Sequence, residues 1–208
     1  MAKKRMKLHS CLRYGGWYTD TDTVTIRETT EVKTNTVALS DVYVTNANLF
    51  FQKQYEFLRL LMIEADRRYT GIGKEFFWYR NQILIELKGW NSLGPVLLTD
   101  TINKLCHVGR GTNSSILGHH KHCYGLTVLK HIYFHPIKHP DRTVLFQSQS
   151  DVFWNSIFSR SYSVHFFGSN TSGRRGWLTG RHTAYDYLGQ NYCPVIYSIQ
   201  NNMNLWVK

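Results

Sequence analysis

Long apolar stretches are missing from this sequence. No run of about 18 apolar residues occurs, and the basic segment Lys3–Lys7 is not followed by the short apolar run of a signal peptide. We therefore expect no membrane anchor in the chain as written. Internal repeats and low-complexity segments are also missing. Hydrophobic residues make up 42% and aromatic residues 14% of 208 positions, so the composition is that of a globular chain able to bury a core as one domain.

Cysteine is scarce. The chain has four cysteines, Cys11, Cys106, Cys123 and Cys193. Their wide spacing excludes the common zinc patterns. Cys106 and Cys123 could close a short loop in an oxidising lumen, and buried thiols are the alternative. The glycosylation sequons at Asn113 and Asn170 would agree with a luminal chain.

Acidic residues are few. The chain has 14 Asp and Glu against 25 Lys and Arg, which gives a formal net charge of +11. Such a charge suits anionic partners, or it is only a solvated basic surface. We find no zinc-finger spacing, RNA-binding aromatic run or basic heptad, so we expect no nucleic-acid partner. A basic module that binds polyanions stays open as an alternative that depends on charge alone.

Two of the few carboxylates stand together, at Asp20 and Asp22, after the glycine turn Gly15–Gly16. In an extended segment, residues two apart project to the same side. Two carboxylates at such a short distance repel each other unless a cation lies between them. An all-oxygen pair suits a hard divalent ion, Mg²⁺ or Mn²⁺, that keeps positions open for phosphate oxygens. A solvated acidic turn is the alternative.

The hydrophobic pattern predicts a mixture of strands and helices. We expect extended structure at 17–28, 42–44, 49–51 and 162–167, helices at 52–69 (ended by Gly71 and Gly73), 95–105 and 176–192 (stopped before Pro194), and a loop at 109–125. This alternation favours α/β or mixed sheet packing.

A set of short segments, in order, resembles the α1,4-glycosyltransferases, the family of lactosylceramide 4-α-galactosyltransferase and α1,4-N-acetylglucosaminyltransferase. The resembling segments are Cys11–Arg13, Gly15–Gly16, Asp20–Asp22, Val24–Ile26, Asn46–Phe51, Gly94–Thr99, Phe134–Ile137, Ser163–Phe167 and Tyr192–Pro194. In the family these read as Leu-Arg, Gly-Gly, Asp-Thr-Asp, a Val/Ile strand, an Asn-Gly segment, Gly-Pro-x-Leu-Leu-Thr, Phe-Tyr-Pro-Ile, Ala-Val-His-x-Trp and Tyr-Cys-Pro. Together they cover most of residues 9–194.

The resemblance implies a partial GT-A-like fold for nucleotide-diphospho-sugar transfer, as one partial α/β domain over residues 1–208. Its parts would be an Asp-x-Asp sugar-binding region at 9–70, a probable insertion at 72–89 and a C-terminal region at 90–208. The implied reaction is metal-dependent transfer of galactose or N-acetylhexosamine from a UDP-sugar to a glycolipid or glycan acceptor, in α1,4 linkage with retention. The implied location is the luminal side of the Golgi membrane.

The resemblance also implies roles for individual residues. His165 would complete an Mn²⁺ or Mg²⁺ site with Asp20 and Asp22, and a half-buried strand histidine is the alternative. The donor side would include Arg13, Gly15, Gly16 and Tyr18, and the acceptor side Gly94 and Pro95. Arg13 could equally be a surface residue, Tyr18 a packed strand aromatic, and Pro95 only the start of a helix. No catalytic residue is assigned.

The chain departs from the family pattern near its start. The family has a nucleotide-binding half before the glycine turn, whereas only about a dozen residues precede Gly15 here. The helix that the family places between Leu12–Arg13 and the glycines is nearly absent. We therefore expect an N-terminally truncated chain. The alternative to an active transferase is a remnant that binds UDP-sugar weakly or not at all.

Overall fold

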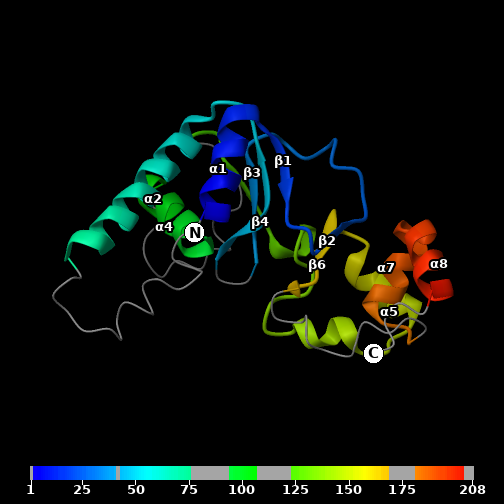
Figure 1. Cartoon of the computed structure of the whole chain (residues 1–208). Helices are drawn as coiled ribbons and strands as arrows, with labels where there is room; N and C mark the ends of the chain where they lie inside the picture. The colour runs from blue at the N-terminus through cyan, green and yellow to red at the C-terminus, as the bar shows by residue number, and fades with distance from the viewer. Residues whose placement is uncertain (1, 41–42, 76–93, 107–122, 169–180, 204–208) are drawn as a thin grey trace. The chain divides into compact units, whose positions relative to one another are not determined.

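The computed structural model describes residues 2–40, 43–75, 94–106, 123–168 and 181–203 (Figure 1). The chain forms two compact units. The first contains Met1–Thr19 and Val32–Lys130, and the second contains Asp20–Glu31 and His131–Lys208. Each unit has its own sheet and its own hydrophobic core. The mixture of helices with parallel and antiparallel strands confirms the predicted α/β class at this level.

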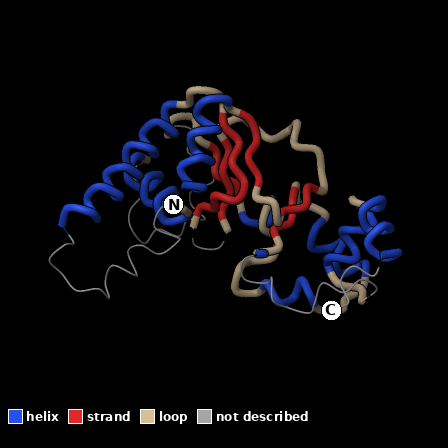
Figure 2. Tube along the Cα trace, in the orientation of Figure 1, coloured by secondary structure: helices blue, strands red, loops and turns tan. Residues whose placement is uncertain are grey.

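A four-stranded sheet forms the centre of the first unit, and its strands are drawn in red in Figure 2. The order is β1 (Gly16–Thr19), β4 (Val44–Phe51), β3 (Thr36–Leu39) and β5 (Thr127–Leu129). Strand β4 pairs antiparallel with both β1 and β3, whereas β3 and β5 are parallel. All four residues of β3 are buried, so this strand lies at the interior of the unit.

Three helices cover this sheet: α1 (Ala2–Tyr14), α2 (Glu56–Glu75) and α4 (Pro95–Leu105). Helices α1 and α4 contact β4, and α2 contacts both of these helices. The apolar side of α2 carries Phe57 and Leu61, which are 0% and 1% exposed. Apolar residues three or four positions apart form one face of a helix, which explains why this segment packs as it does.

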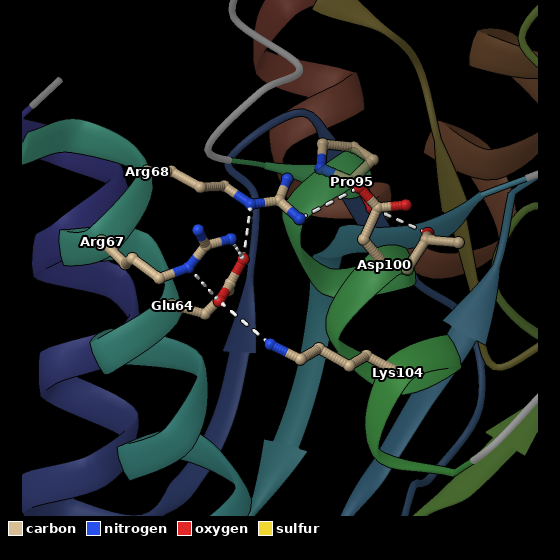
Figure 3. Close-up of polar contacts among 7 residues, drawn as sticks. Glu64, Arg67, Arg68, Pro95, Asp100 and Lys104 are labelled. Carbon is tan, nitrogen blue, oxygen red and sulfur yellow. Dashed lines mark hydrogen bonds and ion pairs between the residues drawn. The ribbon is translucent and has the colours of Figure 1, made fainter. Parts of the chain in front are cut away.

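Charged side chains join α2 to α4 (Figure 3). Glu64 is paired with Arg67 at 2.8 Å and with Arg68 at 3.1 Å, and Arg68 also reaches Asp100 at 3.0 Å. Lys104 lies 3.8 Å from Glu64. Glu64 is therefore the common acceptor of this network.

A disulfide joins Cys106, directly after α4, to Cys123, which precedes β5. The sequence left two alternatives open, a loop closed by this pair or buried thiols, and the structure has the first. Of the other cysteines, Cys11 is buried and free, and Cys193 is exposed and free.

The second unit contains a two-stranded antiparallel sheet, β2 (Thr23–Thr25) with β6 (Ser163–His165). The described residues of this unit also form three α-helices and two short 3₁₀ helices: α5 (Asp151–Phe158), α7 (Ala184–Tyr192), α8 (Pro194–Met203), η2 (His131–Tyr133) and η3 (Arg142–Phe146). Trp154 and Leu145 are 0% exposed at the centre of the core. The ring of Trp154 stacks on Phe158 with centroids 5.5 Å apart.

A buried carboxylate caps α7. Asp186 is 2% exposed and accepts hydrogen bonds from the backbone of Arg181 and from both the backbone and the hydroxyl of Thr183. The hydroxyl of Tyr197, on α8, donates to its other oxygen at 2.8 Å. This reciprocal capping box fixes the start of α7 and ties α8 to it.

Several predicted elements are confirmed. The helix at 95–105 has the predicted bounds, and β6 lies within the predicted strand at 162–167. The extended segment 17–28 contains two strands, β1 and β2, which belong to different sheets. The predicted strand at 49–51 lies within β4, which begins at Val44, the last residue of the predicted strand at 42–44; residue 42 lies outside the described residues. Residues 76–93 and 107–122 lie outside the described residues, and most of the predicted insertion and of the predicted loop falls there.

Other predictions are wrong. Helix α2 begins at Glu56 rather than at 52 and continues through Gly71 and Gly73 to Glu75, since a glycine inside a helix costs only about 1 kcal/mol. Helix α7 begins at Ala184, after its N-cap Thr183, rather than at 176, and residues 176–180 of the predicted helix lie outside the described residues. Its end at Tyr192 confirms the predicted stop before Pro194, which starts a further helix, α8.

Arg13 lies in the last turn of α1, a helix that the sequence interpretation did not predict. Helix α5 and strands β3 and β5 were also missed.

Candidate metal centre

The glycine turn ends α1 and starts β1. Gly15 and Gly16 both have positive φ, +69° and +92°. The backbone N–H of Gly15 donates to the carbonyl of Cys11 at 2.9 Å, which closes the last turn of the helix. A Cβ on Gly15 would lie 2.6 Å from the backbone nitrogen of Lys53. Glycine is therefore required there by both the left-handed backbone and the close approach of the chain.

The two aspartates lie on a turn between β1 and β2, where the backbone N–H of Thr23 donates to the carbonyl of Asp20. In the antiparallel pair, Thr23 is directly opposite His165, and the N–H of Phe166 donates to the carbonyl of Asp22 at 2.8 Å. This register brings the end of β6 to the aspartate turn.

Three possible metal ligands converge here within the second unit. A ligand atom from each of Asp20, Asp22 and His165 lies within 4.8 Å of the other two. Two metal–ligand bonds of about 2 Å span about 4 Å, so small side-chain rotations would bring all three ligands to one ion. The predicted proximity of His165 to the aspartates is therefore confirmed, and two carboxylates with one imidazole are a donor set that fits Mn²⁺ and, less closely, Mg²⁺.

Asp22 is held at a fixed orientation. Nε2 of His165 lies 3.1 Å from Oδ1 of Asp22, and the backbone N–H of Gly168 donates to Oδ2 at 2.5 Å. Burial alone would raise the pKa of Asp22, but the hydrogen bond and charge of His165 and the N–H of Gly168 lower this pKa to about 2. The carboxylate is therefore ionised at neutral pH and available to a cation.

Aromatic rings enclose His165 on its other side. Its ring lies 4.5 Å from that of Phe167 and 5.3 Å from that of His135, centroid to centroid. His165 is half-buried and His135 is 1% exposed. Phe167 adopts a left-handed backbone with φ +55°, which is uncommon for a large residue and costs about 1 kcal/mol or more. This strain lies directly beside the candidate ligand.

The other predicted site residues belong to the first unit. Arg13 lines a surface groove with His9, Tyr14 and Lys53, and its guanidinium lies 5.2 Å from the ring of Tyr14.

The ammonium group of Lys7 lies 4.7 Å from the ring of Tyr18 and lines a small hollow together with Gly94. One lysine thus adjoins a predicted donor residue and a predicted acceptor residue. Pro95 is the first residue of α4. The roles of Arg13 and Tyr18 stay predictions, as do those of Gly15, Gly16, Gly94 and Pro95.

Two further residues of the centre were missed from the sequence. Gly168 contacts Asp22 from 146 positions away, and nothing in its local pattern indicates that contact. His135 could have been noticed because it stands where the resembling family has tyrosine, within Phe134–Ile137.

Comparison with known proteins assigns the family. The conserved region of the alpha 1,4-glycosyltransferases matches residues 86–200, which is more than half of the chain. The chain belongs to this family. His165 lies inside the matched region, and this assignment confirms the resemblance found in the sequence.

Curated relatives in the α1,4-glycosyltransferase family cover 88% of this chain. Lactosylceramide 4-alpha-galactosyltransferase of Gorilla gorilla gorilla is 28% identical over 183 residues, which are 49% of that protein. The Homo sapiens protein of that name is 28% identical with 45% covered, and that of Mus musculus is 27% identical with 44% covered. The chain spans about half the length of these relatives. No solved structure matches this chain.

No helix among the described residues is long and apolar enough to cross a membrane.

Proposed function

We propose that this member of the α1,4-glycosyltransferase family transfers galactose or N-acetylhexosamine from a UDP-sugar to a glycolipid or glycan acceptor, with retention and with the help of a divalent metal. The observation that supports this most directly is the convergence of Asp20, Asp22 and His165 within 4.8 Å. The names of the curated relatives support the galactose donor and a lactosylceramide-like acceptor.

In this proposal, Asp20 and Asp22 supply the negative charge that holds Mn²⁺ or Mg²⁺, and His165 supplies a nitrogen. The ion would act as a Lewis acid that stabilises charge on the departing diphosphate. The N–H of Gly168 keeps the Asp22 carboxylate turned toward the centre. The ring of Phe167 shields one side of His165 from water. A GT-A-like arrangement of the transferase is part of the same proposal.

Luminal placement, by resemblance in the Golgi, is proposed together with the activity. The Cys106–Cys123 disulfide supports it, because such bonds persist in oxidising compartments and are rare in the cytosol.

The test uses carboxylate variants of the 208-residue chain. Asp20→Asn and Asp22→Asn should abolish Mn²⁺ binding measured by isothermal titration and should abolish sugar transfer from UDP-galactose to a lactose-terminated acceptor. Each keeps the size of the side chain and removes its charge. Asp141→Asn, an exposed aspartate of the second unit outside the centre, is the matched control and should bind as the wild type does.

The outcomes separate the alternatives. Mn²⁺ binding without turnover would favour the inactive remnant that binds sugar weakly. If either variant transferred sugar at the wild-type rate, the metal assignment would be wrong. The net charge of +11 favours a second candidate, a polyanion-binding module, and binding to heparin that falls steeply with salt and ignores the Asp variants would support it.

A further inference from the structure

An unpartnered buried histidine lies behind the candidate metal centre. His135 is 1% exposed, and among the described residues neither Nδ1 nor Nε2 of its ring has a hydrogen-bond partner. Within the same part of the chain, Nδ1 of His165 is also buried without a partner. Buried polar atoms are nearly always hydrogen-bonded, and leaving them unpaired costs about 1–3 kcal/mol each. Two adjacent rings with complementary unsatisfied nitrogens therefore point to an interaction between them.

We propose that His135 is a positioning residue that hydrogen-bonds Nδ1 of His165, and so orients the imidazole that the proposed function assigns to the metal. His135 is not itself a ligand in this proposal. The atoms of the centre within 4.8 Å of one another come, among the described residues, from Asp20, Asp22 and His165. We assign this hydrogen bond to the protein without metal, so only its effect on metal binding rests on the proposed function.

The geometry of the two rings supports direct contact. Their centroids are 5.3 Å apart and their planes are at 87°. At that separation, an N–H···N bond of about 2.9 Å is within reach of small ring rotations. A half turn of His135 about its Cβ–Cγ bond exchanges ring nitrogens with carbons and keeps the outline of the ring, so a nitrogen can face His165 without repacking.

The backbone around His135 is firmly held. Its N–H donates to the carbonyl of His131 at 2.6 Å, within the turn that begins as η2. The neighbouring Phe134 is 1% exposed and its ring stacks on Tyr162 with centroids 5.5 Å apart. A ring carried on a fixed backbone can orient a partner, because its own position is already determined by packing.

A neutral imidazole can serve His165 with or without metal, because it has one donor and one acceptor nitrogen. In a neutral His165, an N–H at Nε2 would face Oδ1 of Asp22, 3.1 Å away, and Nδ1 would accept from His135. If Nε2 held a metal ion, the ring proton would lie on Nδ1 and a nitrogen of His135 would accept from it.

The charged and titratable groups that influence His135 are His165, His131 and Asp22. His139 packs against Phe167, with ring centroids 5.2 Å apart.

The experiment compares His135→Phe with His135→Gln in the full chain. Phenylalanine keeps a ring and removes both nitrogens, whereas glutamine keeps a donor and an acceptor. The first readout is the ¹⁵N chemical shift of Nδ1 of His165 without metal, which reports whether that nitrogen is hydrogen-bonded. The second is the Kd for Mn²⁺ from isothermal titration. His139→Gln is the matched control, since it removes a neighbouring imidazole that packs on Phe167.

We expect His135→Phe to move the Nδ1 shift to that of an unbonded nitrogen and to raise the Kd for Mn²⁺ about 10–100-fold, the usual effect of losing a partner of a metal-ligating histidine. His135→Gln should stay within a few-fold of wild type, and His139→Gln should leave both readouts unchanged. An unchanged Nδ1 shift and Kd in a folded His135→Phe protein would overturn the inference. A wild-type Nδ1 shift typical of an unbonded nitrogen would overturn it even if the variant does not fold. Failure of the wild type to bind Mn²⁺ would instead count against the proposed function.

Discussion

At the scale of single residues, the backbone of Gly168 controls the position of the Asp22 carboxylate. Its N–H bonds Oδ2 of Asp22, and a Cβ added to it would lie 3.1 Å from that same oxygen. Contacts that short force the neighbour to shift by a few tenths of an ångström. The absence of a side chain at Gly168 is therefore part of the geometry of the centre.

We predict that Gly168→Ala weakens Mn²⁺ binding about tenfold, because the carboxylate of Asp22 is displaced while its charge is kept. Isothermal titration measures this effect, and the thermal unfolding midpoint measured alongside shows that the fold is retained. Wild-type affinity in the alanine variant would mean that Asp22 is free to turn and that Gly168 does not hold it.

The ligand residues could be predicted because their chemistry is visible in short patterns. Asp20 and Asp22 stand two positions apart, and His165 lies in a strand-like segment that resembles a family motif. The contacts of Gly168 and His135 could not be predicted. These contacts depend on the pairing of β2 with β6 and on the positions of buried ring nitrogens in the folded chain, and the local sequence indicates neither.

At the scale of elements, helix α7 depends on the buried cap at Asp186. We predict that Asp186→Ala lowers the free energy of unfolding by about 3 kcal/mol, because buried donors of Thr183, Arg181 and Tyr197 lose their acceptor together. Chemical denaturation measures it. Asp151→Ala, which removes an exposed carboxylate from the first turn of α5, is the control and should cost no more than about 1 kcal/mol. Equal losses in the two variants would show that the cap adds nothing specific.

The link between α2 and α4 should depend on pH through Glu64. The hydrogen bond from Arg67 lowers the pKa of Glu64 to about 2, against a smaller opposing effect of burial and with further help from Arg68. A carboxyl group whose pKa is lower in the folded state stabilises the fold above its unfolded pKa of 4.5, and that contribution is lost as pH falls toward 2.

We therefore expect Glu64→Gln to be less stable than wild type by about 1 kcal/mol at pH 6, and the difference to vanish near pH 2. Urea denaturation at a series of pH values follows it. Glu56→Gln, which breaks an exposed pair with Arg59 on the same helix, should show a smaller difference. A difference between Glu64→Gln and wild type that persists unchanged to pH 2 would contradict the ion-pair explanation.

Prediction of elements from the sequence succeeded where one strong signal determined the answer and failed where signals competed. Pro95 in a first turn and a clear apolar face gave the bounds of α4. In α2, two glycines indicated a stop, but they cost less than the packing of the helix contributed, and the helix continues. The N-terminal helix α1 was missed because basic residues obscure its short apolar face, formed by Leu8 and Cys11, which are buried only by tertiary packing.

At the scale of the whole molecule, the two units have separate cores, and the disulfide lies entirely in the first. We predict that Cys106→Ser with Cys123→Ser destabilises the first unit by about 3 kcal/mol, as expected when a loop of 17 residues is released. Hydrogen exchange should quicken for amides of β3 and β4 and stay unchanged for those of α5 and α7.

Cys193→Ser is the matched control for this experiment, since it removes an exposed free thiol. Its exchange should match the wild type in both units. Uniform acceleration over both units in the double serine variant would show that they unfold as a single cooperative body, contrary to the prediction.

The division into two units was not predicted from the sequence, which suggested one continuous domain. Its cause is the placement of residues 20–31 with the later part of the chain, because β2 pairs with β6 rather than with a neighbour in sequence. The sequence does not identify such a distant partner, because the side chains of each strand alternate between faces just as they would in a local hairpin.

That pairing has a consequence for the order in which the protein is made. Gly168 and Asp22 are 146 positions apart, and a ribosome adds about 5–20 residues per second, so the aspartate turn is synthesised roughly seven to thirty seconds before its partners. Most of the first unit is synthesised during this interval, because Val32–Lys130 is complete before His131 is translated. The candidate centre can therefore assemble only after Val32–Lys130 has been translated and the segment that carries His165 and Gly168 has followed it.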